Sequence, residues 1–354
     1  MKVLMLTKNL DRPEANLMLG LSKKGIKIKL IMHRDSPFQE VLKGSSIAIE
    51  YWDFKNRLDI KSIFFLRKLF KRESIDIIHT FSARSLTSSL IASIFSEVKH
   101  VTYRGTTGHL SWFDPSSWLS YFNPRVSKII CVSDAVKSYL LEKGLSETRL
   151  ARVYKGHREE WYKVQSNVKR EDFNLHAEDF IVGCSANMRP VKGVDLLIKA
   201  FKEIPAKLRI KALLIGEVRD SKIENMMQDD SLKERIVFTG YRADAPAIVS
   251  FCDAFCMPSR KREGLPKALI EAMIQAVPCI ISDVGGMPEL VKNNQHGLVV
   301  AEENPKEIAQ AIMKLYENRE FARGLGIAAR ERIINNFSIE NTVEQTLEVY
   351  QSLL

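Results

Sequence analysis

Short apolar runs alternate with helical patterns along most of the chain. Lys2–Thr7 is an apolar run of strand length, Glu14–Lys23 has helical spacing, and Ile26–Met32 is apolar again. The same order returns later, where Phe180–Ala186 precedes a helical pattern over Val194–Lys202. Strands that alternate with helices are typical of parallel sheets covered on both faces. The pattern therefore predicts an α/β protein.

Further elements continue this α/β pattern through both halves of the chain. More strands are expected at Ile47–Trp52, Ile75–Thr80, Val101–Arg104, Lys128–Ser133, Lys211–Gly216, Arg235–Gly240, Ala254–Pro258 and Gly297–Val300. More helices are expected over Ile60–Arg72 and Ala135–Lys143, from Pro266 as the first helical position, after Asn304, and from Ser338 to Leu354. A chain of 354 residues is long enough for two such domains. The charge-dense stretch Glu159–Arg170 is the expected linker, so we predict domains at residues 1–165 and 166–337 and a last helix at 338–354.

The composition is that of a globular protein, with 45% apolar and 27% charged residues. No run approaches the ~18 apolar residues of a membrane-spanning helix, and the first ten residues hold too short an apolar stretch for a signal peptide. The expected location is the cytoplasm. The five cysteines are odd in number and lie in apolar stretches, so we expect buried free thiols rather than disulfides or a metal site.

Positive charge is concentrated in the first half of the chain. Residues 1–165 carry 28 Lys and Arg against 16 Asp and Glu, whereas residues 166–354 carry 25 against 27. Such an asymmetry indicates a surface that meets an anionic partner, such as phospholipid head groups or nucleic acid. Two stretches fit a membrane surface: Ile60–Arg72 mixes apolar and basic positions, and Trp112–Pro124 is rich in aromatic residues. Each also fits ordinary packing within its own domain.

Two carboxylates stand out in the second half. Glu263 is expected in the loop before the helix that starts near Pro266, and Glu271 in the second turn of that helix. Carboxylates accept hydrogen bonds from sugar hydroxyls, and a helix amino terminus favours phosphate, so the layout suits a nucleotide sugar. The alternative is structural: an i, i+4 ion pair between Lys267 and Glu271, worth about 0.2–0.5 kcal/mol, and a solvated Glu263.

A cationic turn precedes another helix of the second domain. Arg189 and Lys192 flank the turn between the strand ending at Ala186 and the helix starting near Val194. Fixed positive charge beside a helix amino terminus is suited to binding a diphosphate. Because both turns follow strands of one parallel sheet, they are expected at the same sheet edge.

The stretch Pro258–Leu290 resembles the signature of retaining glycosyltransferases of family 4, which are two-domain enzymes of the GT-B type. The matching positions are Ser259, Glu263-Gly264, Glu271-Ala272-Met273, Pro278, Gly285-Gly286, Pro288-Glu289 and Gly297. The resemblance implies two Rossmann-like, doubly wound parallel-sheet domains facing a central cleft, with the C-terminal helix crossing back to the first domain. It also implies transfer of a sugar from a nucleoside-diphosphate sugar, most simply a UDP-sugar, to a glycan or glycolipid acceptor in polysaccharide or lipopolysaccharide synthesis.

The resemblance also implies roles for individual residues. Arg189 and Lys192 would bind the donor diphosphate, Glu271 the ribose, and Glu263 a hydroxyl of the donor sugar. The other donor-site positions are Ser259, Gly264, Leu265 and Pro266 of the signature stretch, with Tyr241 and Arg242 in the loop that holds the nucleobase. Fixed positive charge would stabilise the leaving diphosphate, so neither a metal ion nor a cofactor is expected.

The chain departs from the family pattern in two places. Family members commonly carry a His near the acceptor, where this chain has Arg104; either His109 takes its place, Arg104 binds phosphate, or His109 is an ordinary surface residue. The loop Lys8–Ala15 lacks the Gly-Gly pair of many relatives and has Arg12-Pro13 instead.

Several other functions lack their signatures in this sequence. It has no Gly-x-Gly-x-x-Gly turn for a dinucleotide and no P-loop. No RNA-reading aromatic motif or zinc pattern accompanies the basic half, so nucleic acid is not an expected partner. A nucleotide-sugar epimerase or a sugar phosphorylase of the same architecture remains the alternative.

Overall fold

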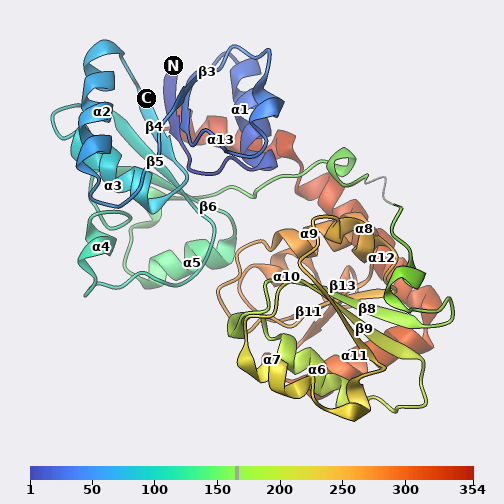
Figure 1. Ribbon diagram of the computed structural model, residues 1–354. Coiled ribbons are helices and arrows are strands. Elements are labelled where there is room, and N and C mark those ends of the chain that lie inside the picture. Colours follow the sequence, from blue (N-terminus) through green and yellow to red (C-terminus); the bar gives the residue numbers. More distant parts are fainter. Residues whose placement is uncertain (164–166) are drawn as a thin grey trace. The chain divides into compact units, whose positions relative to one another are not determined.

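The computed structural model describes residues 1–163 and 167–354, and these form two compact units (Figure 1). The first consists of Met1–Gly156 together with Phe337–Leu354, and the second of His157–Asn336. The domain boundary expected at 165/166 lies outside the described residues. No helix within the described ranges is long and apolar enough to cross a membrane.

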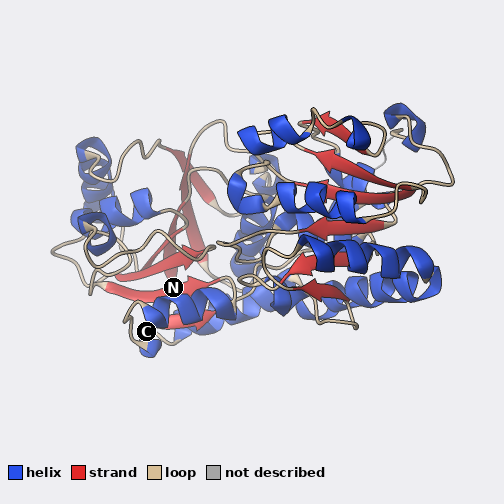
Figure 2. Ribbon diagram, turned by 90° about the horizontal axis from the view of Figure 1, so that it is seen from below, coloured by secondary structure: helices blue, strands red, loops and turns tan. Residues whose placement is uncertain are grey.

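The first unit is built on a seven-stranded parallel sheet with the order β3-β2-β1-β4-β5-β6-β7. Its strands are β1 Lys2–Leu6, β2 Lys27–Met32, β3 Ala48–Tyr51, β4 Ile77–Thr80, β5 Lys99–Arg104, β6 Val126–Cys131 and β7 Leu150–Arg152. Its helices are α1 Arg12–Lys23, α2 Ile60–Arg72, α3 Ala83–Ala92, α4 Pro115–Trp118, α5 Asp134–Glu142 and α13 Ile339–Gln351. The central strands β1 and β4 are buried on both faces, because helices cover both sides of the sheet (Figure 2).

The C-terminal helix α13 belongs to this first unit and packs against α1. The helix approaches the rest of the unit closely at two glycines. A side chain on Gly156 would collide with Ser338 O, and one on Gly20 with Val343. The Tyr350 hydroxyl lies 2.6 Å from His79 Nδ1 at the centre of the sheet. The expected return of the last helix to the first domain is confirmed.

The second unit has a six-stranded parallel sheet with the order β10-β9-β8-β11-β12-β13. Its strands are β8 Phe180–Ser185, β9 Ile210–Ile215, β10 Ile236–Gly240, β11 Ala254–Met257, β12 Cys279–Ser282 and β13 Gly297–Val300. Its helices are α6 Val194–Glu203, α7 Ser221–Met226, α8 Ala245–Ser250, α9 Lys267–Ile274, α10 Met287–Leu290, α11 Pro305–Glu317 and α12 Arg319–Asn336. The strand order reverses between β8 and β11, and in open α/β sheets ligands bind outside the carboxyl ends of the strands at such a point.

Local signals account for several helix ends. Asn304 Oδ1 accepts a hydrogen bond of 3.1 Å from Glu307 N at the start of α11, and Ser338 Oγ one of 3.3 Å from Asn341 N at the start of α13. These are the caps that the sequence predicts. Pro266 differs from its expected place: it is the residue before α9 rather than its first helical position, since its ψ of 124° is extended.

The five cysteines are buried and free, as expected. Burial raises the pKa of each thiol, to about 12 for Cys131 and Cys184. They are inert core residues at neutral pH.

Candidate active site

The cationic turn after β8 and the carboxylate-bearing turn after β11 meet in the second unit. Lys192 Nζ lies 2.7 Å from Glu263 Oε1, which joins side chains 71 positions apart in the sequence. The backbones are joined too, since Arg260 N donates a hydrogen bond of 2.9 Å to Val191 O. Both turns follow the strands at which the sheet order reverses, β8 and β11. The structure thus brings two predicted site residues into direct contact at the expected sheet edge.

Arg260 fastens the two turns to each other. Its guanidinium donates to the Asp195 carboxylate at 2.6 and 2.8 Å and to Pro190 O at 2.9 Å. Asp195 lies in the first turn of α6 and is almost fully buried. Burial alone would raise the pKa of Asp195, but the hydrogen bonds and charge of Arg260 hold it below its ordinary value. This pair was not predicted, because Arg260 belongs to a sequence stretch that indicates only a polar loop.

Two glycines allow the turns to approach closely. Gly193 has φ 63°, and a Cβ there would lie 1.9 Å from Pro258 O. Gly285 has φ 56°, and a Cβ there would lie 2.1 Å from Glu263 O. No side chain fits either place, and the left-handed backbone disfavours other residues as well. The backbone on both sides of Glu263 is therefore held by close packing.

The two carboxylates of the signature have different surroundings. Glu263 is 6% exposed, and its Oε1 accepts a second hydrogen bond of 2.7 Å from Ser259 Oγ. Glu271 lies on α9 and pairs with Lys267 at 2.9 Å, so the structural alternative considered for it does occur. Burial raises the pKa of Glu271, and Lys267 opposes this only in part. An ion pair to an exposed lysine does not prevent Glu271 from accepting a ligand hydroxyl.

The remaining predicted donor-site residues lie on the same unit. Arg189 is exposed at the start of the turn Pro190–Lys192. Tyr241, which follows β10, is 78% exposed, whereas Arg242 is held by two hydrogen bonds of 2.7 Å to Asp244. Gly264, Leu265 and Pro266 form the segment between Glu263 and α9. The Arg242 side chain thus stabilises its own loop.

The acceptor-side candidates lie on the first unit, Arg104 as the last residue of β5 and His109 in the loop that follows it. Arg104 donates to Thr106 O at 3.0 Å and to Gly108 O, and its guanidinium lies 4.7 Å from the centre of the Tyr121 ring. His109 is exposed and has φ 62°. Arg104 therefore shapes the loop on which His109 is carried.

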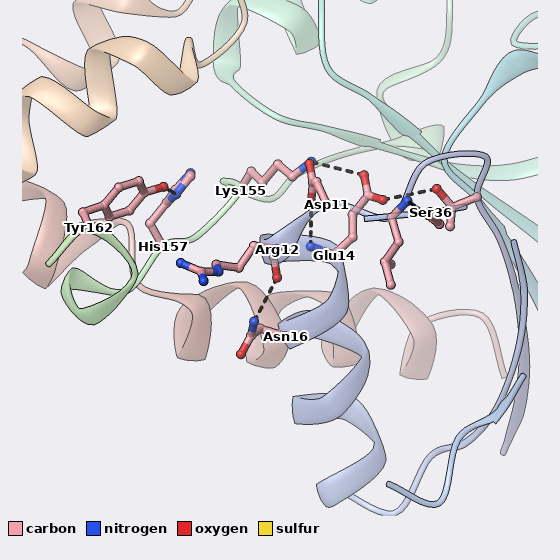
Figure 3. Close-up of polar contacts among 10 residues, drawn as sticks. Asp11, Arg12, Glu14, Asn16, Ser36, Lys155, His157 and Tyr162 are labelled. Atoms are coloured by element: carbon pink, nitrogen blue, oxygen red, sulfur yellow. Dashed lines mark hydrogen bonds and ion pairs between the residues drawn. The ribbon is translucent and has the colours of Figure 1, made fainter. Parts of the chain in front are cut away.

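A partly buried charge cluster in the first unit was not predicted. Lys155 Nζ forms ion pairs with Asp11 and, at 3.1 Å, with Glu14 (Figure 3). Burial raises the pKa of Glu14, against the effect of Lys155. Asp11 also accepts a hydrogen bond of 2.9 Å from Glu14 N and so caps α1. The chain thus closes this helix end with its own carboxylate beside Arg12-Pro13.

No group of three or more His, Cys, Asp or Glu side chains that could hold a metal ion occurs among the described residues.

Sequence comparisons place both units in known families. The family model "Glycosyl transferases group 1" matches residues 165–332, and the model "Glycosyltransferase Family 4" matches residues 15–160. One curated relative is the UDP-Gal:alpha-D-GlcNAc-diphosphoundecaprenol alpha-1,3-galactosyltransferase of Escherichia coli, 25% identical over 82% of this chain and 79% of its own. Another is the N-acetyl-alpha-D-glucosaminyl L-malate synthase of Bacillus anthracis, 25% identical over 90% of this chain and 84% of its own.

Solved structures show the same architecture. The Anabaena protein HepE, crystallised in complex with UDP, superposes with a TM-score of 0.82 at 21% identity and covers 99% of this chain and all of its own. A sucrose-phosphate synthase of Thermosynechococcus elongatus superposes with a TM-score of 0.80 at 19% identity, covering 100% of this chain and 99% of its own. The predicted pair of Rossmann-like parallel-sheet domains is confirmed. With family models matched in both units and this shared fold, the chain belongs to the group 1, family 4 glycosyltransferases of the GT-B type.

Proposed function

We propose that this glycosyltransferase moves a sugar from a UDP-sugar to a lipid-linked glycan, with retention of anomeric configuration, in the synthesis of a cell-surface polysaccharide. The observation that carries the proposal is the meeting of Lys192 and Glu263 at the sheet reversal of the second unit. There a cation suited to a diphosphate and a carboxylate suited to sugar hydroxyls lie side by side. A nucleoside-diphosphate sugar presents those two groups next to each other.

The names of the relatives support the proposed classes of donor and acceptor. The Escherichia coli relative is named for UDP-galactose and a diphosphoundecaprenol acceptor, and a Staphylococcus aureus relative for capsular polysaccharide biosynthesis. HepE was crystallised with UDP and with UDP-glucose. We extend these to this chain as a UDP-sugar donor and a glycolipid acceptor.

In the proposed reaction, the bond between the anomeric carbon and the β-phosphate oxygen breaks as the acceptor hydroxyl attacks. Negative charge grows on the departing diphosphate, and Arg189 and Lys192 stabilise it from the turn before α6. Glu263 and the backbone around Gly264 and Leu265 hold the sugar, and Glu271 holds the ribose. The acceptor proton goes to an oxygen of the departing phosphate on the same face, which accounts for retention. The fixed positive charges make a metal ion unnecessary in this proposal.

The acceptor side is proposed to approach an anionic membrane. The first unit carries 26 Lys and Arg against 17 Asp and Glu, whereas the second has 27 against 26. Large apolar side chains are exposed among these charges: Phe113 is 96% and Phe64 is 64% exposed. Basic and aromatic side chains together suit an anionic bilayer surface. The enzyme would then work from the cytoplasmic face of the membrane.

A panel of UDP-, GDP- and ADP-sugars tests the function, with undecaprenyl-diphosphate-linked sugars as acceptors. We expect a new glycosidic product from a UDP-sugar, with the anomeric configuration of the donor by NMR. Arg189→Ala should lower kcat/KM by at least ~10²-fold, the scale of removing one donor to a developing anion. The control Arg323→Ala removes an exposed arginine of α12 and should leave the rate unchanged. An isomerised donor without transfer would instead support an epimerase, and phosphate-dependent cleavage of a glycan a phosphorylase.

A further inference from the structure

The carboxylate and the cation proposed to grip the donor are bound to each other in this structure. Glu263 Oε1 accepts from Lys192 Nζ at 2.7 Å and from Ser259 Oγ at 2.7 Å. The Glu263 side chain is 8% exposed and that of Lys192 21%, so water screens the pair only weakly. Within the described part of the chain, no hydrogen bond or ion pair engages the Arg189 side chain. Of the two diphosphate-binding candidates, Lys192 is the one that must first give up a partner.

We propose that the Lys192–Glu263 pair makes the site select the intact nucleotide sugar over the bare nucleoside diphosphate. This inference rests on the proposed function and adds a role that the individual residues do not have alone. An intact donor supplies a phosphate oxygen for Lys192 and a sugar hydroxyl for Glu263. A nucleoside diphosphate supplies only the first of these. When it draws Lys192 away, Ser259 is the one side-chain partner that the described residues leave to the buried Glu263.

The cost of that exchange follows from burial. A buried carboxylate separated from its cation loses far more than an exposed one, because little water can replace the cation. The intact donor offsets part of this loss with hydroxyl hydrogen bonds to the charged group, which are among the stronger ones. The product diphosphate cannot, so it competes with Glu263 for the same ammonium group. After transfer the pair forms again, and this favours release of the nucleotide.

The geometry confines the change to one side chain. Glu263 O accepts from Gly286 N at 3.2 Å, and the close packing at Gly285 fixes the backbone there. On the other turn, Gly193 packs against Pro258 O and leaves no room for a shift. Lys192 has four methylene groups and can turn from the carboxylate to a phosphate while both backbones stay in place. Domain movement is not needed for this exchange.

Binding of UDP by isothermal titration calorimetry tests the proposal in a double-mutant cycle. In wild-type protein Glu263 competes with UDP for Lys192, so Glu263→Gln should tighten UDP binding about tenfold, or about 1.4 kcal/mol. Glutamine can still accept the hydrogen bond from Ser259. In the Lys192→Met background, the same Glu263→Gln change should leave UDP affinity unaltered, because the cation for which the carboxylate competes is absent.

A charge control separates the pair from a general effect of net charge. Asp283→Asn removes an exposed carboxylate directly after β12, the strand beside β11. It should change UDP affinity less than twofold. Equal tightening by Glu263→Gln with and without Lys192, or no tightening with Lys192 present, would overturn the selection by the pair while UDP binding itself stands. Absence of UDP, GDP and ADP binding to wild type and to Glu263→Gln alike would overturn the proposed donor site as well.

Discussion

Arg260→Met should loosen the turn that carries Arg189 and Lys192. The substitution removes the guanidinium that donates to Asp195 at 2.6 and 2.8 Å and to Pro190 O at 2.9 Å. Asp195 has a side chain that is 3% exposed, and Lys199 at 3.4 Å is then the one cation left to it among the described residues. Breaking a fully buried pair costs about 3–5 kcal/mol. The Arg260 side chain is 18% exposed and Lys199 remains, so we expect about 2 kcal/mol.

Native-state hydrogen exchange is the suitable assay, because a chain of two units need not unfold in one step. The amides of Lys192 and Gly193 donate within the turn to Arg189 O at 2.8 Å and Pro190 O at 3.2 Å. Their protection should fall about 30-fold in Arg260→Met, which corresponds to about 2 kcal/mol. UDP affinity should fall with it, since the turn is less preorganised.

Two further variants make this prediction specific. Arg260→Met combined with Asp195→Asn leaves no buried charge unpaired and should regain much of the lost protection. Arg219→Met removes a guanidinium that pairs with Glu217 on the surface, where both side chains are more than half exposed, and should have no measurable effect. Unchanged protection in Arg260→Met, within a factor of two, would refute the clamping role of Arg260.

The remaining predictions concern pH, backbone, metal and membrane. The folded-state pKa of Asp195 is lowered, so its pair adds stability above about pH 4, and exchange protection of the turn should decline as pH falls below that value. Gly285→Ala, whose Cβ would lie 2.1 Å from Glu263 O, should lower transfer at least ~10²-fold while circular dichroism stays native, and normal turnover would contradict the packing described. Chelation by EDTA should leave transfer within twofold, and loss of activity restored by Mg²⁺ would disprove metal independence. Phe64→Ser with Phe113→Ser should weaken co-sedimentation with phosphatidylglycerol vesicles, whereas unchanged binding would exclude this surface.

Local patterns predicted the sheets because several strands are continuous apolar runs and several helices begin at a capping side chain. Strand β1 and the cap of α11 at Asn304 are examples. The 18-residue helix α12 was not predicted, since its buried residues are mostly alanine and glycine with few large apolar side chains. Small residues pack well against α9 but give little periodic signal in sequence.

The site residues, too, were predicted only where a local sequence pattern marks them. Glu263, Glu271, Arg189 and Lys192 were predicted because their turns follow strands and resemble a known signature. The role of Arg260 was not predicted, because its partner Asp195 is 65 positions away in the sequence. A local sequence pattern gives no sign of a contact at that separation.

The Lys155 cluster in the first unit was not predicted, for the same reason. Its ammonium group reaches Glu14 across 141 positions. The sequence shows only that this loop has no Gly-Gly pair, whereas the structure shows that its Asp11 and Glu14 pair with Lys155.

A crystal structure of the protein with a UDP-sugar bound tests the central claim most directly. We predict that the β-phosphate lies within hydrogen-bonding distance of Arg189 and Lys192, with a sugar hydroxyl on Glu263 and the ribose on Glu271. A nucleotide sugar bound elsewhere, or a diphosphate that contacts neither Arg189 nor Lys192, would contradict the account.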